Sequence, residues 1–160
     1  YSKIMKKKAF SWEIFAICLF ISYSAAFLAS LFVYKSVKSG GYASLKPDLA
    51  PSFLASIVIL IFIFFLIACS IYLVWTIASK HDKIQIAWWF LVNLVLNVLW
   101  SILYFGMHNP FFAFIELVLL WLSTLFLMLG VWTIERRAGY ILVPYLLLVT
   151  FIAVLNLQSL

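Results

Sequence analysis

Five stretches of the sequence are almost free of charge over lengths that suffice to cross a lipid bilayer. An α-helix rises about 1.5 Å per residue, so roughly 20 apolar residues cross a hydrocarbon core of about 30 Å. These stretches also lack the polar face that a water-soluble helix needs. The sequence therefore predicts an all-α fold, namely an integral membrane bundle of five transmembrane helices. The stretches are residues 9–34 (apart from Glu13), 49–79, 84–115, 117–134 and 138–160.

The composition leaves little sequence for anything outside the membrane. Of the 160 residues, 68% are hydrophobic and 10% are charged, which predicts a single membrane domain over residues 1–160. Transmembrane β-strands would alternate in polarity, whereas these stretches are continuously apolar. The net charge of +6 resides in the loops and the N-terminal segment, so the predicted partner is the lipid bilayer and not nucleic acid. Cys18 and Cys69 fall inside predicted helices and are interpreted as small apolar packing residues.

Helix breakers and polar turns divide the chain. The segment 35–51 contains two glycines and two prolines, so it cannot form one continuous helix. Three short turns, at 80–83, 106–110 and 135–137, predict that the helices they join are antiparallel neighbours. Asn109 is predicted to cap the helix that follows it. The helices are expected at about residues 11–34, 52–79, 84–105, 111–133 and 139–156.

Basic residues are distributed unevenly between the two ends of these helices. The N-terminal segment and the turns 80–83 and 135–137 carry eight Lys and Arg residues, whereas the other side carries three. Because basic residues concentrate in cytoplasmic loops, the N-terminus is predicted on the cytoplasmic side and the C-terminus on the opposite side. The first apolar stretch is too long for a signal-peptide core and is predicted to be the first span.

Small residues line one side of the first predicted helix. Ser22, Ala26 and Ser30 follow one another at intervals of four, which places them on one face. In lipid such a stripe allows helices to approach closely. The stripe therefore predicts helix packing either within one bundle or between two bundles, and it leaves a homodimer open.

Polar and aromatic residues share one face of the third predicted helix. Trp89, Asn93, Asn97, Trp100 and Tyr104 are spaced by three or four residues, which places all five on one side. The amides offer hydrogen bonds and the rings offer stacking surface, so the stripe predicts a site for a flat ligand with carbonyl or carboxyl groups. The alternative is that the two asparagines only join neighbouring helices by side-chain hydrogen bonds.

Three further positions in the last two helices are costly in a membrane and are candidates for a polar site. A carboxyl group at Glu116 must be neutral, paired or hydrogen-bonded, which indicates either a bond to a neighbouring helix or a role with protons or substrate. Pro144 interrupts the last helix and is expected to kink it beside the Tyr145 hydroxyl. Asn156 is expected to satisfy a terminal carbonyl or a loop.

The sequence offers little for metal or cofactor chemistry. The histidines, His81 and His108, fall in predicted turns, and no cluster of His, Cys and carboxylate residues has metal-ligand spacing. No metal site and no required cofactor are therefore predicted, and a bound haem or porphyrin would lack axial ligation and rest on stacking and shape. Because no acid–base pair or nucleophile with a base is visible, an enzyme is not expected, although the sequence does not decide this.

The last three helices carry, in this order, Asn97, Trp100, Glu116, Pro144, Tyr145 and Asn156. The order and spacing of these residues resemble the translocator protein family, also called TspO/MBR or tryptophan-rich sensory proteins. The resemblance covers roughly residues 42–157 and implies a five-helix bundle that acts as a membrane receptor or in transport. It implies that Asn97 and Trp100 line the family's pocket for porphyrins and related ligands. Tyr42, Pro47 and Pro51 resemble the first-loop motif, so segment 35–51 is expected to act as a lid. The matching residues in the last three helices are Asn97, Trp100, Phe105, Gly106, Ala113, Glu116, Pro144, Tyr145, Phe151 and Asn156.

The predicted function is a TspO-like protein that holds a hydrophobic planar ligand, a porphyrin or similar, within the bundle. The predicted ligand-binding residues are Asn93, Asn97, Trp100, Tyr104 and Tyr145. Two alternatives stay open: a structural or assembly protein of the same fold without a small ligand, and a membrane enzyme that acts on a tetrapyrrole or lipid. This chain has Leu54, Leu60 and Leu148 where the family usually has tryptophans.

Overall fold

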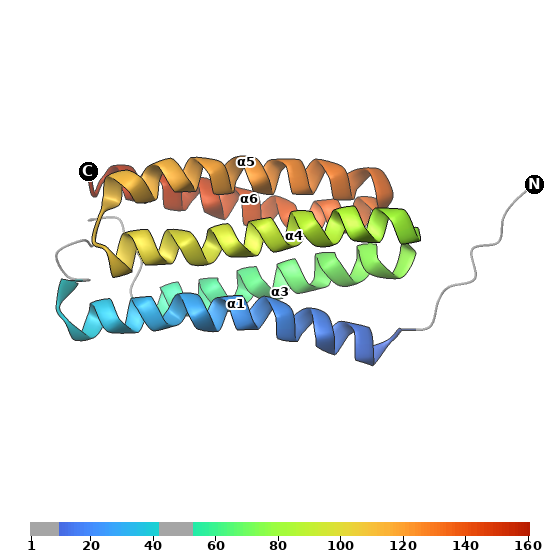
Figure 1. Cartoon of the computed structure of the whole chain (residues 1–160), viewed down its shortest axis with the longest axis horizontal. Coiled ribbons are helices and arrows are strands. Elements are labelled where there is room, and N and C mark those ends of the chain that lie inside the picture. Colours follow the sequence, from blue (N-terminus) through green and yellow to red (C-terminus); the bar gives the residue numbers. More distant parts are fainter. Residues whose placement is uncertain (1–9, 42–52) are drawn as a thin grey trace, which may run out of the picture.

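Five long helices run side by side in the computed structural model, which describes residues 10–41 and 53–160 (Figure 1). A short π-helical turn, η1 (Ile102–Gly106), extends the third of them. All five are long and apolar enough to cross a membrane, and the described ranges contain no strand. The predicted all-α five-helix bundle is therefore confirmed. The helices are α1 (Trp12–Lys38), α3 (Phe53–Ile77), α4 (Lys80–Ser101), α5 (Pro110–Ile134) and α6 (Arg136–Leu157).

The helices form a closed ring. Helix α1 packs against α3 and α4, α3 packs against α6, and α5 packs against both α6 and α4. The prediction that short turns join neighbours holds for α4 with α5 and for α5 with α6. It is wrong for α3 with α4, which are connected through residues 78–79 but each pack mainly on other helices. The reason is that α1 lies against both of them.

Small side chains allow α1 to take this position. Its buried face includes Ser22, Ala25, Ala26 and Ala29, while Ser30 is half-buried. Small residues let helix backbones approach closely where no hydrophobic force acts between helices in lipid. The stripe predicted from the sequence thus packs within the bundle, against the neighbouring helices.

Side-chain caps explain where two helices begin. The segment 80–83, predicted to be a turn, is instead the first turn of α4, because Ser79 caps it. The Asp82 N–H donates to Ser79 Oγ at 3.2 Å, and Ser79 Oγ donates to Asp82 Oδ2 at 2.6 Å. The predicted cap of α5 is confirmed, since the Phe112 N–H donates to Asn109 Oδ1 at 3.2 Å. Both caps satisfy N–H groups that a helix start leaves unpaired.

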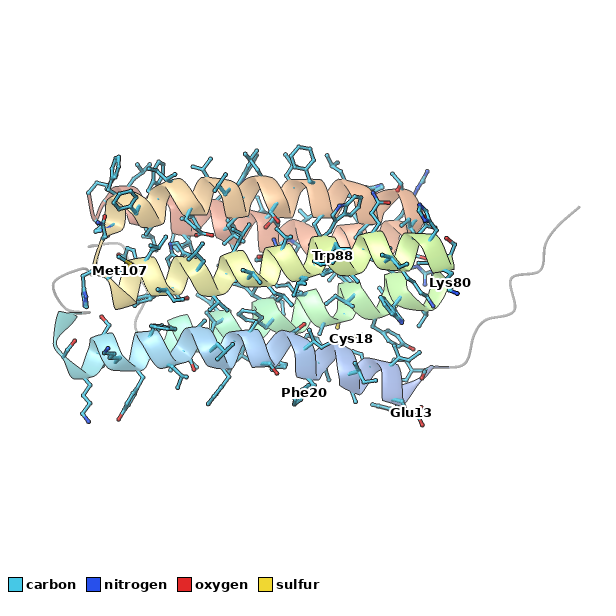
Figure 2. The ribbon with its side chains drawn as sticks, in the orientation of Figure 1. Glu13, Cys18, Phe20, Lys80, Trp88 and Met107 are labelled. Carbon is cyan, nitrogen blue, oxygen red and sulfur yellow. The ribbon has the colours of Figure 1, made fainter. Side chains whose placement is uncertain are left out.

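The outer surface of the bundle is apolar and suits lipid. Large side chains such as Phe20 and Phe126 are 75% and 67% exposed, whereas small and medium ones such as Ala68 and Val74 are fully buried. Figure 2 shows Phe20 pointing away from the bundle. In water such a surface would be unstable, but lipid tails solvate it. The start of α1 and the C-terminus lie at opposite ends (Figure 1), and which end faces the cytoplasm stays a prediction.

Candidate functional site

A chain of hydrogen bonds links three helices at the centre of the bundle. Asn97 Nδ2 on α4 donates to the Tyr145 hydroxyl on α6 at 2.7 Å, and this hydroxyl donates to Asn93 Oδ1 at 2.9 Å. Asn93 Nδ2 donates to Thr124 Oγ1 on α5 at 2.9 Å, and Thr124 Oγ1 donates to the Leu120 carbonyl at 2.8 Å. The polar groups thereby satisfy one another where water is excluded.

The burial of these hydrogen-bonded residues indicates what each of them does. Asn93 and Thr124 are completely buried, and Tyr145 is 1% exposed. Asn93 hydrogen-bonds to residues on α5 and α6 and so links these helices to α4. This agrees with the alternative in which the asparagines join neighbouring helices. Whether Asn93 also contacts a ligand stays a prediction. Tyr145 reaches the network because α6 continues as a helix through Pro144, which is exposed beside it.

A second group of contacts holds the predicted aromatic residues nearer the end of the bundle where α4 ends and α5 begins. Trp100 Nε1 donates to Asn156 Oδ1 at 3.3 Å, and Asn156 Nδ2 donates to the Pro110 carbonyl at 2.8 Å. The Tyr104 ring stacks on the Trp100 ring with centroids 5.4 Å apart, and its hydroxyl lies 2.7 Å from Ser159 Oγ. The Trp100 ring is therefore held in place from two sides.

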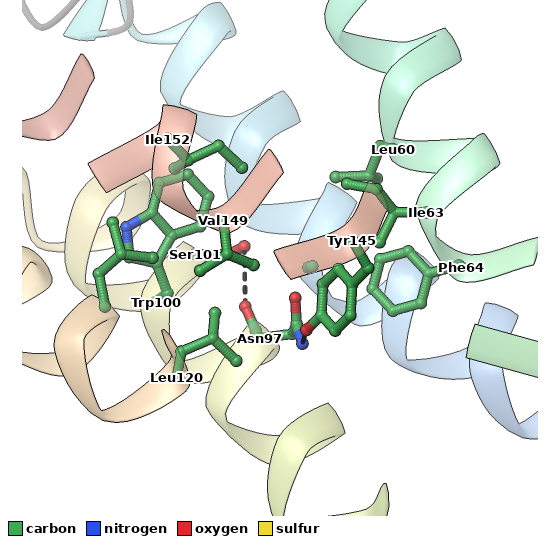
Figure 3. Close-up of a pocket in the computed structure, with 12 residues that line it drawn as sticks. Leu60, Ile63, Phe64, Asn97, Trp100, Ser101, Leu120, Tyr145, Val149 and Ile152 are labelled. Atoms are coloured by element: carbon green, nitrogen blue, oxygen red, sulfur yellow. Dashed lines mark hydrogen bonds between the residues drawn. The ribbon is translucent and has the colours of Figure 1, made fainter. Parts of the chain in front are cut away.

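A small cavity of about 30 Å³ adjoins the hydrogen-bonded residues (Figure 3). Asn97, Trp100 and Ser101 on α4 and Tyr145 on α6 contribute its polar and aromatic wall. Ser101 Oγ donates to the Asn97 carbonyl at 3.3 Å, the bond drawn as a dashed line in Figure 3. A cavity of this size holds a group no larger than one or two water molecules.

The opposite wall of the cavity is apolar. It comes from Ala29 on α1 and from Leu60, Ile63 and Phe64 on α3. The cavity thus lies at the junction of the α1–α3 pair with helices α4, α5 and α6. Leu117 and Leu120 on α5 and Val149 and Ile152 on α6 also line the cavity, so a few polar groups stand among apolar side chains, which suits a largely apolar ligand with a few polar atoms.

The structure brings together part of the predicted site. Asn97, Trp100 and Tyr145 line the cavity, while Asn93 and Tyr104 lie beside it and bond to other residues. The predicted lid residues Tyr42, Pro47 and Pro51 lie outside the described residues. Sequence reasoning missed Ser101, although its spacing of four from Asn97 places it on the same stripe. It also missed the residues of α3, because a uniformly apolar helix gives no sign of which side faces a cavity.

Glu116 is the most unusual side chain near the cavity. It is 3% exposed, and neither carboxyl oxygen has a hydrogen-bond partner within the described ranges. Its neighbours on α5, Leu117 and Leu120, both line the cavity. A bond from Glu116 to an adjacent helix, which the sequence suggested as one possibility, is therefore not found there. Residues 10–41 and 53–160 also contain no group of His, Cys, Asp and Glu residues able to hold a metal ion.

The profile of the TspO/MBR family matches residues 13–160, almost the whole chain. The chain belongs to the TspO/MBR family. With its five apolar helices, this TspO/MBR protein is an integral, multi-pass membrane protein. The family match also agrees with the resemblance seen in the sequence of the last three helices.

Relatives of this TspO/MBR protein occur in distant organisms. The tryptophan-rich protein TspO of Chlorobaculum tepidum is 39% identical over 42% of this chain, and that of Archaeoglobus fulgidus is 30% identical over 59%. These alignments span only 42% and 60% of the relatives' own lengths. The membrane protein YtaB of Bacillus subtilis is 31% identical over 88% of this chain and 91% of its own length.

The family motif residues of this TspO/MBR protein come from different helices and meet near the cavity. Asn97 and Trp100 are on α4, Glu116 is on α5, and Tyr145 and Asn156 are on α6. Asn97 bonds to Tyr145, and Trp100 bonds to Asn156, so two hydrogen bonds between motif residues join α4 to α6.

Proposed function

We propose that this TspO/MBR protein is a membrane receptor or transport-related protein that binds a hydrophobic, planar ligand, such as a porphyrin or a related tetrapyrrole, within the bundle. The observation that carries the proposal is the cavity in which the Trp100 ring, the Asn97 amide and the Tyr145 hydroxyl meet an apolar wall. The ring offers a stacking face, and the polar groups orient one edge of the ligand.

Binding of such a ligand requires the cavity to widen. Pockets for drug-sized molecules measure about 300–1,000 Å³, whereas this cavity measures about 30 Å³. The polar wall is held by hydrogen bonds among α4, α5 and α6, but Ile63 and Phe64 on α3 face it through apolar contact. We therefore place the opening between α3 and the polar wall, because moving α3 there breaks none of those hydrogen bonds.

Connections between the two groups of helices lie toward the ends of the bundle. Ser70 Oγ on α3 donates to the Ala138 carbonyl on α6 at 3.1 Å. At the other end, Ser36 Oγ on α1 lies 3.3 Å from His108 Nε2 in the turn before α5. These connections support a bundle that stays attached at its ends while its middle widens around a flat ligand.

A titration with protoporphyrin IX tests the proposal. The protein is purified in a neutral detergent, and its tryptophan fluorescence is followed as the porphyrin is added. Saturable quenching is expected, and Trp100→Leu is expected to weaken binding about two- to tenfold, since an aromatic pair contributes about 0.5–1.5 kcal/mol. Trp88→Leu is the matched control, because Trp88 is 61% exposed on the outer surface and does not line the cavity.

The second candidate, a structural protein of the same fold without a small ligand, is favoured by the small cavity and the satisfied Asn93–Tyr145 bond. It predicts quenching that rises linearly with porphyrin and is the same for wild type, Trp100→Leu and Trp88→Leu after correction for the lost fluorophore. That result would show only partitioning into the detergent and would end the ligand-binding proposal.

A further inference from the structure

Four basic residues, together called the basic surface, lie at one end of the bundle: Lys80, Lys83, Arg136 and Arg137. Figure 1 shows the α3–α4 and α5–α6 junctions at the same end, and Figure 2 places Lys80 there. The hydrogen bond between Asn93 and Thr124 fixes the register of the antiparallel helices α4 and α5. Ten residues separate Asn93 from Lys83, and ten separate Thr124 from the last residue of α5. At about 1.5 Å per residue, the first turn of α4 is therefore level with the α5–α6 junction.

The positive charges of the basic surface are available to a partner. Lys80, Arg136 and Arg137 are exposed, and within residues 10–41 and 53–160 their side chains have no ion-pair or hydrogen-bond partner. Lys83 Nζ lies over the Trp75 ring, 5.4 Å from its centroid. This contact holds the ammonium group beside an aromatic face without neutralising its charge.

The acidic residues at the same end are held by helix starts. Asp82 Oδ2 accepts from the Ser79 hydroxyl at 2.6 Å, and Glu135 Oε1 accepts from the Arg137 backbone N–H at 3.1 Å. Glu13 lies in the first turn of α1, also at this end (Figure 2). The helix macrodipole stabilises carboxylates at a helix start but disfavours cations there. The basic residues at the starts of α4 and α6 therefore do not serve helix stability, and an external anion would offset their electrostatic cost.

Aromatic rings place the basic surface at the level of lipid headgroups. Trp75 lies in the last turn of α3, and Trp132 lies in the last turn of α5. The Trp132 ring lies against the ring of Tyr140 on α6, with centroids 4.3 Å apart, and Tyr140 is exposed. Trp and Tyr rings concentrate at the boundary between hydrocarbon and headgroups. Lys and Arg side chains just beyond such rings reach the phosphate groups of the nearest leaflet.

The surroundings of the basic surface favour a lipid over a free phosphate ion. Ile77 and Ile84, which flank Lys80 and Lys83 in the sequence, are 50% and 59% exposed. Acyl chains solvate such side chains, whereas a free phosphate ion leaves them uncovered. A partner that combines a phosphate group with hydrocarbon matches both parts of this surface.

We propose that the basic surface binds the headgroups of anionic phospholipids, such as phosphatidylglycerol, in the leaflet at this end of the bundle. The guanidinium groups of Arg136 and Arg137 match the geometry of phosphate oxygens, and Lys80 and Lys83 add positive charge beside them. The proposal is independent of the cavity and of any ligand bound in it. It holds whichever end of the bundle faces the cytoplasm.

Thermal unfolding of the full chain in a neutral detergent tests the proposal. The midpoint is followed by circular dichroism while dioleoylphosphatidylglycerol, dioleoylphosphatidylcholine or inorganic phosphate is added. A ligand of the folded bundle raises the midpoint, and phosphatidylglycerol is expected to raise it most. In the variant Arg136→Gln/Arg137→Gln, half of the maximal rise is expected to need about 5- to 25-fold more phosphatidylglycerol, since each cation contributes about fivefold. Lys35→Gln/Lys38→Gln is the matched control, because it removes two exposed cations from the last turns of α1 at the opposite end.

Lys80→Gln/Lys83→Gln is a second variant, expected to change the lipid requirement in the same direction, and it carries the test if the arginine variant does not fold. Loss of the phosphatidylglycerol effect in about 0.5 M NaCl supports the proposal, because salt screens exposed charges. An equal rise with phosphatidylcholine overturns it, since headgroup charge would then not matter. An equal rise with inorganic phosphate assigns the surface to the free ion instead. Equal losses in the arginine variant and in Lys35→Gln/Lys38→Gln would show a general attraction by net charge, which also overturns the proposal.

Discussion

Replacing Asn93 by leucine tests whether the central hydrogen bonds hold α4, α5 and α6 together. The change keeps the number and branching of the side-chain heavy atoms but removes the bond to Thr124 and the acceptor for Tyr145, both at 2.9 Å. Thr124 keeps a partner, because it still donates to the Leu120 carbonyl. The Tyr145 hydroxyl still accepts from Asn97 but loses its own acceptor.

The expected loss of stability follows from these partners. Two hydrogen bonds within a membrane contribute about 0.6 kcal/mol each on average. A buried hydroxyl left without an acceptor costs about 1–3 kcal/mol more. Asn93→Leu is therefore expected to lower the free energy of unfolding by about 2–4 kcal/mol. In a Tyr145→Phe background no hydroxyl is left unpaired, so the same change is expected to cost only about 0.6 kcal/mol.

A double-mutant cycle measures the difference between these two costs. The unfolding free energies of wild type, Asn93→Leu, Tyr145→Phe and the double variant are obtained from reversible denaturation in mixed micelles. Thr150→Val is a control, because it removes two hydrogen bonds on an exposed face, one from Trp121 Nε1 and one to the Leu146 carbonyl, both at 2.9 Å. A coupling energy between Asn93 and Tyr145 below about 0.5 kcal/mol would refute the reasoning, since independent sites add within that margin.

Three further predictions concern packing, capping and topology. Gly130→Val is expected to destabilise the bundle by about 1–3 kcal/mol, because an added Cβ would overlap the Trp89 ring. Thermal unfolding measures the loss of stability, and rescue by Trp89→Ala confirms its cause. Ser79→Ala is expected to cost about 1 kcal/mol through loss of the α4 cap, and an unchanged unfolding temperature would contradict it. Labelling of intact cells with an impermeant maleimide is expected to reach Leu160→Cys but not Arg137→Cys, and the reverse pattern would overturn the predicted orientation.

The extent to which the sequence predicted the site differs from helix to helix. On α4 the site stands out, because Asn97 and Trp100 are polar or amphipathic residues in an apolar helix and intramembrane polar groups are rare. On α3 the lining residues Ile63 and Phe64 carry no such signal, since every neighbouring position is equally apolar. The spacing on α4 also did not show that Asn93 would be fully engaged by α5 and α6.

Turn chemistry was predictable where a single local motif decides it. Asn109 was identified as a cap because a short polar residue before a proline satisfies the first N–H groups of a helix. The segment 80–83 was less clear, because four polar residues in a row suit both a turn and the first turn of a capped helix. The Ser79–Asp82 hydrogen bonds decide in favour of the helix.

The sequence by itself determined the solvent, the number of spans and their helical form. Lipid solvates only long apolar segments whose backbone groups are paired internally, and this requirement can be read from composition and length. The tertiary structure decided which helices are neighbours, where the cavity lies, and that Glu116 has no partner within the described ranges. These features depend on the shapes of facing side chains, because apolar surfaces in lipid gain no hydrophobic energy from contacting one helix rather than another.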